Sequence, residues 1–176
     1  MRGFTLIELL VVLAITLFLS TLITPFIRKN NSYRIEQEIE KIILLCDYLS
    51  QRAIAANDTQ ELIIDTSKQR YFFIKNNKHI VNALPPEIVF SFIPGTYGRP
   101  GDPKNPITQT ITFPHKQDQN GLFVMQFFSN GKMSAGTAYI SDKEKKYMGA
   151  LTCTSPQVSY IRKYMYKANN WILLNV

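Results

Sequence analysis

The first 27 residues form an almost unbroken run of apolar side chains. Between Phe4 and Ile27 the only charged residue is Glu8, and residues 9–27 carry no charge. A helix over this run would be about 36 Å long at 1.5 Å per residue, which is enough to cross the hydrocarbon core of a bilayer. The pattern therefore predicts a membrane helix over residues 4–27, with one acid near its start.

A second, amphipathic helix is predicted over residues 28–57, because apolar residues recur there at steps of three and four. The apolar stripe consists of Ile35, Ile39, Ile42, Ile43, Cys46, Leu49, Ala53 and Ala56. The intervening positions are polar and include Arg34, Glu36, Gln37, Glu38, Glu40, Lys41, Asp47 and Arg52. A single stripe of this kind is typical of a helix that packs by one side on a domain.

Residues 58–176 change to short β-rich runs separated by turn residues. We expect strands over residues 61–65, 70–75, 79–82, 88–92, 107–113, 123–128, 135–141, 149–154, 158–165 and 171–174. The stretch 93–106 contains four prolines and three glycines, which predicts a surface loop. A helix followed by many short strands indicates an α+β fold, in which the helix stripe covers an antiparallel sheet.

Length and composition support this organisation. The 176 residues, less the apolar segment, suit one small domain. The apolar run is longer than the core of a cleaved secretory signal and lacks a small-residue cleavage site, so we expect the segment to stay attached.

The N-terminal string Gly-Phe-Thr-Leu-Ile-Glu, followed by an unbroken apolar helix, resembles the N-terminus of type IV pilins and type II secretion pseudopilins. In that family a prepilin peptidase cuts after the glycine and the new N-terminal residue is N-methylated. The resemblance implies a leader of residues 1–3, cleavage after Gly3 and methylation of Phe4. It also implies that Glu8 pairs with the terminal amine of a neighbouring subunit during assembly, and that Pro25 is the helix-kinking proline of many pilins.

Two later stretches, LPPEIVFSF and FFSNGKMSAGTAYIS, together with a closing basic strand, resemble the GspH/FimT group of minor pseudopilins and minor pilins. This resemblance implies a structural subunit of a type II secretion pseudopilus, anchored by a single pass in the bacterial inner membrane with its globular domain in the periplasm. The implied partners are other pseudopilins or pilins, the prepilin peptidase, the inner-membrane assembly platform and the lipid bilayer. The alternative is a minor pilin of a type IV pilus or competence system that binds DNA.

The net charge of +7 bears on this alternative. Near the C-terminus, Arg162, Lys163 and Lys167 are interleaved with Tyr160, Tyr164 and Tyr166, and a second basic cluster contains Lys143, Lys145 and Lys146. Cations neutralise phosphates and aromatic rings stack on bases, so the first cluster is a candidate DNA-binding site. The other interpretation is a solvated basic face whose aromatic residues pack inward.

No residue pattern predicts an enzyme, a metal site or a cofactor. The two histidines, His79 and His115, have no acidic or cysteine partner at a catalytic or metal-binding spacing. The two cysteines, Cys46 and Cys153, can form a disulfide in an oxidising compartment or remain buried free thiols.

Overall fold

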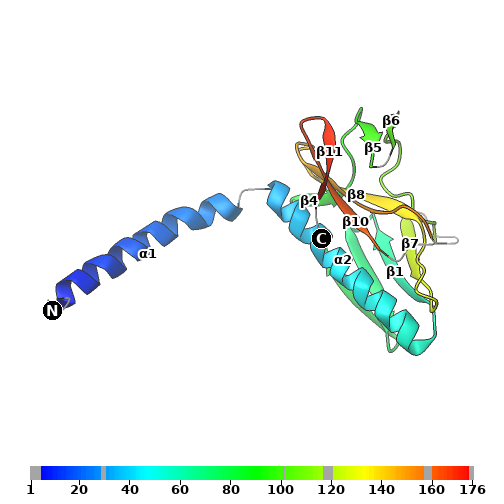
Figure 1. Cartoon of the computed structure of the whole chain (residues 1–176), viewed down its shortest axis with the longest axis horizontal. Helices are drawn as coiled ribbons and strands as arrows, with labels where there is room; N and C mark the ends of the chain where they lie inside the picture. The colour runs from blue at the N-terminus through cyan, green and yellow to red at the C-terminus, as the bar shows by residue number, and fades with distance from the viewer. Residues whose placement is uncertain (1–4, 29–30, 101, 117–120, 157–159, 175–176) are drawn as a thin grey trace. The chain divides into compact units, whose positions relative to one another are not determined.

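The structure is a computed structural model that describes residues 5–28, 31–100, 102–116, 121–156 and 160–174. The chain divides into two compact units, Met1–Asn31 and Ser32–Val176. The first unit contains the helix α1 (Leu6–Arg28) (Figure 1). The described side chains of residues 5–20 are all exposed. Within the part of the chain whose side chains are described, no helix is long and apolar enough to cross a membrane.

The second unit combines one long helix with antiparallel strands. The helix is α2 (Asn31–Ala56). A first sheet has the strand order β3-β2-β1-β7, with β1 (Gln60–Asp65), β2 (Arg70–Lys75), β3 (Lys78–Ala83) and β7 (Leu122–Phe127). A second sheet has the order β11-β10-β9-β8-β4, with β4 (Ile88–Phe90), β8 (Gly136–Asp142), β9 (Met148–Cys153), β10 (Arg162–Lys167) and β11 (Asn170–Leu174).

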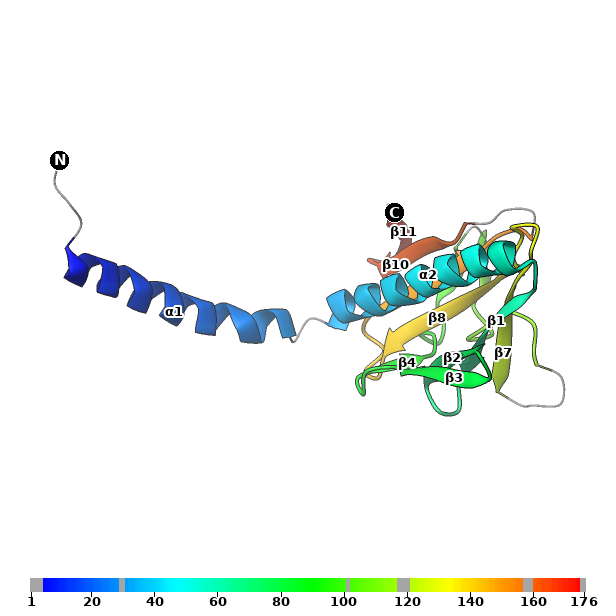
Figure 2. The same cartoon turned by 90° about the horizontal axis from the view of Figure 1, so that it is seen from below.

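The core forms where α2 meets both sheets (Figure 2). Seven residues of the predicted stripe are buried, namely Ile35, Ile39, Ile42, Ile43, Cys46, Leu49 and Ala53. They cluster with first-sheet residues such as Leu62, Phe73 and Phe127, and with second-sheet residues such as Ile140, Leu151 and Met165. The predicted α+β class, with a helix stripe covering antiparallel strands, is therefore confirmed.

Two positions on α2 differ from the predicted pattern. Ala56 is exposed because it is the last residue of the helix and lies beyond the sheets' cover. Glu38, expected to be solvated, is only 3% exposed. Its carboxylate is paired with the Lys41 ammonium one turn later, at 2.5 Å, so the buried acid keeps a charged partner.

Gly149 on β9 brings α2 close to the second sheet. A β-carbon added at this position would lie 2.5 Å from Ile39 Cδ1 and 3.0 Å from Ile35 Cγ2. Ordinary carbon contacts need roughly 3.5–4 Å. The helix can therefore rest on β9 only because this residue has no side chain.

The stretch between β4 and β7 departs from prediction in two places. Residues 93–106, expected to be a loop, contain the paired strands β5 (Tyr97–Arg99) and β6 (Asp102–Pro106). Residues 107–113, expected to be a strand, make only an isolated bridge between Ile111 and Ala138. The reason is competition for one edge of β8, because β4 already pairs with residues 140–142 and leaves only residues 137–139 to the incoming segment.

Candidate functional site

The first turn of α1 is closed by reciprocal hydrogen bonds between Thr5 and Glu8. The Thr5 amide and the Thr5 hydroxyl each donate to Glu8 Oε2 at 2.9 Å. The Glu8 amide donates in return to Thr5 Oγ1 at 3.4 Å. This arrangement is a capping box, which satisfies backbone N–H groups that a helix leaves unpaired at its start.

Thr5 is thus a site residue that the sequence reasoning missed. The signal was present, since threonine three residues before glutamate at the start of an apolar run is the pattern of a capping box. Both bonds to the carboxylate end on Oε2. In the isolated chain, Glu8 is therefore held by its own helix through one of its two oxygens.

Three further residues of the N-terminal segment were predicted as site residues. Gly3 and Phe4, the predicted cleavage and methylation positions, lie outside the described residues. Pro25 lies within α1, three residues before the helix ends at Arg28.

Residues 1–24 match the family model described as the prokaryotic N-terminal methylation motif. The chain carries the methylation motif. The matched range contains Gly3, Phe4 and Glu8, which confirms the N-terminal resemblance predicted from sequence. Among solved structures, the minor pseudopilin EpsH from the type 2 secretion system of Vibrio cholerae is similar with 14% identity and a TM-score of 0.41, over 80% of this chain and 95% of that chain. No curated protein matches the sequence.

Outside the methylation motif, the predicted basic strand does not form one cationic surface. Lys163 is 8% exposed, and its ammonium donates to Glu40 Oε2 of α2 at 2.6 Å. Tyr164 and Tyr166 pack with Trp171 in a separate cluster on the second sheet. Successive strand residues point to opposite faces, so Lys163 lies on the helix side and the tyrosines on the other.

DNA binding by this cluster stays a prediction, for which Lys163 would first have to leave its pair with Glu40 of α2. Arg162 stacks on Tyr160, with the guanidinium carbon 5.2 Å from the ring centroid, and donates to the Tyr160 hydroxyl at 2.8 Å. Lys167 is exposed at the end of β10. Tyr164 and Tyr166 pack inward as the other interpretation expects, whereas Arg162, Lys163 and Lys167 do not lie together on one solvated face.

The Lys163–Glu40 pair should fasten β10 to α2. Glu40→Gln is expected to lower the free energy of unfolding by about 1–3 kcal/mol, because it leaves a buried ammonium without its carboxylate. The cost stays below that of a fully buried pair because the Glu40 side chain is 42% exposed. Urea unfolding in detergent measures the change.

Two further variants test the cause of that loss. Adding Lys163→Met to Glu40→Gln should restore most of the stability, since the unpaired buried charge is then gone. The control Glu36→Gln, on the preceding turn of α2, should change stability by less than about 0.5 kcal/mol. A double variant no more stable than Glu40→Gln alone would show that the pair contributes through packing and not through charge.

Cys46 and Cys153 are both buried and are not bonded to each other in the structure. Cys46 belongs to the α2 stripe and Cys153 ends β9, and both lie in the main core. Burial raises the pKa of each thiol above its ordinary value. A thiol kept protonated in this way is a poor nucleophile, so the structure assigns both residues a packing role.

The histidines also have packing partners. His79 stacks on Phe72 with ring centroids 5.4 Å apart, and His115 lies 4.4 Å from Phe123. Among the described residues, no group of three or more histidine, cysteine or acidic side chains could hold a metal ion.

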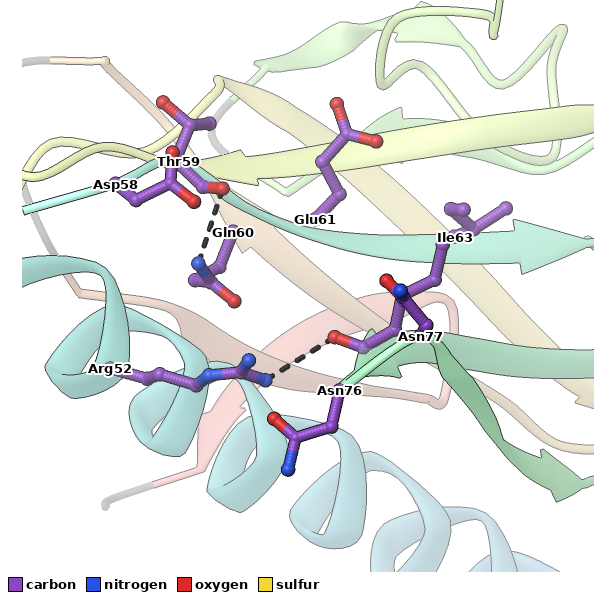
Figure 3. A pocket seen from close by; sticks show the side chains of 9 residues that line it. Arg52, Asp58, Thr59, Gln60, Glu61, Ile63, Asn76 and Asn77 are labelled. Carbon is purple, nitrogen blue, oxygen red and sulfur yellow. Dashed lines mark hydrogen bonds between the residues drawn. The ribbon is translucent and has the colours of Figure 1, made fainter. Parts of the chain in front are cut away.

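A pocket with a volume of about 440 Å³ lies beside the C-terminal half of α2 (Figure 3). Two of its charged groups have separate partners. Arg52 donates to the Ile74 carbonyl at 3.3 Å, and Glu61 accepts from Gln126 at 3.0 Å. These two groups therefore do not converge on one point of the pocket.

Proposed function

We propose that this protein is a structural minor pseudopilin of a type II secretion system. The observation that carries the proposal is the methylation motif over residues 1–24, in which Gly3 and Phe4 stand at the cleavage position and an apolar helix follows. The prepilin peptidase would cut after Gly3, and the amine of Phe4 would then be methylated. The choice of a secretion pseudopilus follows the GspH/FimT-like stretches of the sequence.

The proposed role of Glu8 follows from electrostatics. A carboxylate within an apolar membrane segment costs roughly 2.5 kcal/mol or more, and an isolated terminal amine in the same layer is costly for the same reason. Pairing the Glu8 carboxylate with the Phe4 amine of a neighbouring subunit relieves both costs. Assembly would thus be driven by satisfying two charges that the separate subunits leave in an unfavourable place.

Membrane anchoring by residues 4–27 completes the proposal. The globular unit would then lie in the periplasm, attached to the inner membrane by α1 until assembly. Its partners would be the other pseudopilins, the prepilin peptidase, the inner-membrane assembly platform and the bilayer. The role is structural, and the described side chains supply no constellation on which to propose a reaction.

Blocking the cleavage position tests the proposal directly. In a host that contains a prepilin peptidase, intact-mass measurement should show the wild-type chain without residues 1–3 and with one added methyl group. Gly3→Val should retain the full leader and no methyl group, because the side chain obstructs the peptidase at the bond to be cut.

A second glycine serves as the matched control. Gly95→Ala, in an exposed loop where nothing lies within 4 Å of the added carbon, should be processed like the wild type. Loss of the leader from the Gly3 variant, or an unprocessed wild-type chain, would contradict the proposed function.

A further inference from the structure

Two turns of the second sheet project from the same end of the domain. The β8–β9 turn spans residues 143–147, and the β10–β11 turn spans residues 168–169. The register places them together, because Met148 pairs with both Ser141 on β8 and Tyr166 on β10, and Lys167 pairs with Asn170 across the second turn.

This is also the end of the domain at which α2 begins. Gly149, the second residue of β9, lies against Ile35 in the second turn of the helix. The Lys143 amide donates to the Glu87 carbonyl at 3.0 Å, and the Glu87 carboxylate pairs with Arg34 of α2 at 2.8 Å. Arg28 ends α1 and Asn31 begins α2, so only two residues separate the two helices in the sequence.

The exposed charge on the two turns is predominantly basic. Lys143, Lys146 and Lys167 are exposed, and we call these three residues the basic patch. The one exposed acid of the turns, Glu144, is paired with Lys146 at 2.7 Å. Asp142, the last residue of β8, is fully buried and accepts from the Lys146 and Tyr147 amides, each at 2.8 Å.

The remaining lysine of the turn is directed inward. Lys145 donates to the hydroxyls of Ser91 and Ser141, and desolvation lowers its pKa. It therefore orders the turn and does not belong to the basic patch.

Aromatic residues border the basic patch. Tyr147 is 40% exposed, and Tyr166 lies 5.2 Å from Trp171 between ring centroids. Lysine side chains can extend along a bilayer interface with their ammonium groups in water, and tyrosine and tryptophan are the residues that favour the headgroup layer. The combination of cations and amphipathic rings at one end of the domain is thus suited to a lipid surface.

We propose that the basic patch docks on anionic lipid headgroups of the bilayer that holds α1. This inference rests on the proposed function for the position of the membrane. Anionic headgroups attract basic side chains within a Debye length of about 8 Å at physiological salt. Docking would hold the domain against the membrane before assembly, and lifting the subunit into a filament would break these contacts.

The single tryptophan of the chain reports on this docking, because Trp171 lies at the β10–β11 turn. The full-length chain is reconstituted into vesicles of phosphatidylcholine, with or without phosphatidylglycerol, that contain lipids brominated near the headgroup. We expect stronger quenching of Trp171 fluorescence in the phosphatidylglycerol vesicles, and a return to the phosphatidylcholine level in high salt.

Two triple variants that remove the same charge distinguish an effect of the basic patch from an effect of the net charge of the chain. The triple variant K143Q/K146Q/K167Q should lose the extra quenching, because each cation removed weakens docking by about fivefold. The control K75Q/K78Q/K132Q removes the same charge from turns beside the C-terminal half of α2, where Lys75 lies 5.5 Å from the Tyr48 ring centroid. It should behave like the wild type.

Flotation of the same samples tests the membrane anchor separately. The docking proposal would be contradicted by Trp171 quenching that does not depend on phosphatidylglycerol, or by an equal loss of quenching in the two triple variants. This holds even if the chain floats with every vesicle. If the chain floats only with phosphatidylglycerol vesicles, and K143Q/K146Q/K167Q does not float, the result would support docking by the basic patch. It would contradict membrane anchoring by residues 4–27.

Discussion

Glu8→Ala is expected to reduce incorporation of the subunit into filaments by more than tenfold while leaving its association with membranes intact. The reason is that the variant would bury a neighbour's Phe4 amine without a carboxylate, and breaking a buried charge pair from one side costs about 3–5 kcal/mol. Membrane association should persist because alanine makes the segment more apolar. Sheared-filament yield and resistance to alkaline extraction measure the two properties.

The capping box offers a second explanation for any loss in Glu8→Ala, because the Glu8 carboxylate also accepts from the Thr5 amide and hydroxyl. Glu8→Gln separates the two. Glutamine completes a capping box as glutamate does, but it carries no charge. We therefore expect Glu8→Gln to assemble as poorly as Glu8→Ala, and wild-type assembly of Glu8→Gln would assign the residue to helix capping alone.

Gly149→Ala should clearly destabilise the globular unit. Its added carbon would lie 2.5 Å from Ile39 Cδ1, so α2 must shift away from β9, at a cost of about 1–3 kcal/mol for an overpacked core. A thermal melt in detergent, followed by Trp171 fluorescence, should show a lower midpoint than the wild type.

Shortening the opposing side chain should reverse this loss. Ile39→Val removes Cδ1, so the double variant with Gly149→Ala should be more stable than the sum of the two single effects predicts. Gly136→Ala, which instead meets the ring of Phe113, should combine additively with Ile39→Val. An additive result for Gly149→Ala and Ile39→Val would show that the helix does not rest on β9 at this point.

Most of the secondary structure follows from local pattern. The α2 stripe was predicted through Ala56 and is buried through Ala53, because its period of three to four residues depends only on helix geometry. The break between the strands predicted at residues 70–75 and 79–82 is a turn in which Asn76 and Asn77 both adopt positive φ, at 50° and 58°. The methylation motif was predicted because it is a contiguous string.

The candidate site was predicted less completely. Glu8 was identified from the sequence as a charge in an apolar run, whereas Thr5 became a site residue only through its bonds to Glu8. The pairing of Lys163 with α2 was not predicted, because alternation along a strand does not show which face meets the helix. That choice depends on the register with β9 and on the position of Glu40 in α2.

The sequence by itself determined the apolar N-terminal segment with its single acid, the methylation motif, the amphipathic helix and most of the strands, because each depends on residues close together in the chain. Only the tertiary structure decided which strands share a sheet, why residues 107–113 form a bridge and not a strand, and which lysines remain exposed. These features depend on competition for strand edges and on contacts between residues far apart in sequence, such as Lys163 with Glu40. The position of the basic patch beside the start of α2 is of the same kind, since strand pairing places its two turns together.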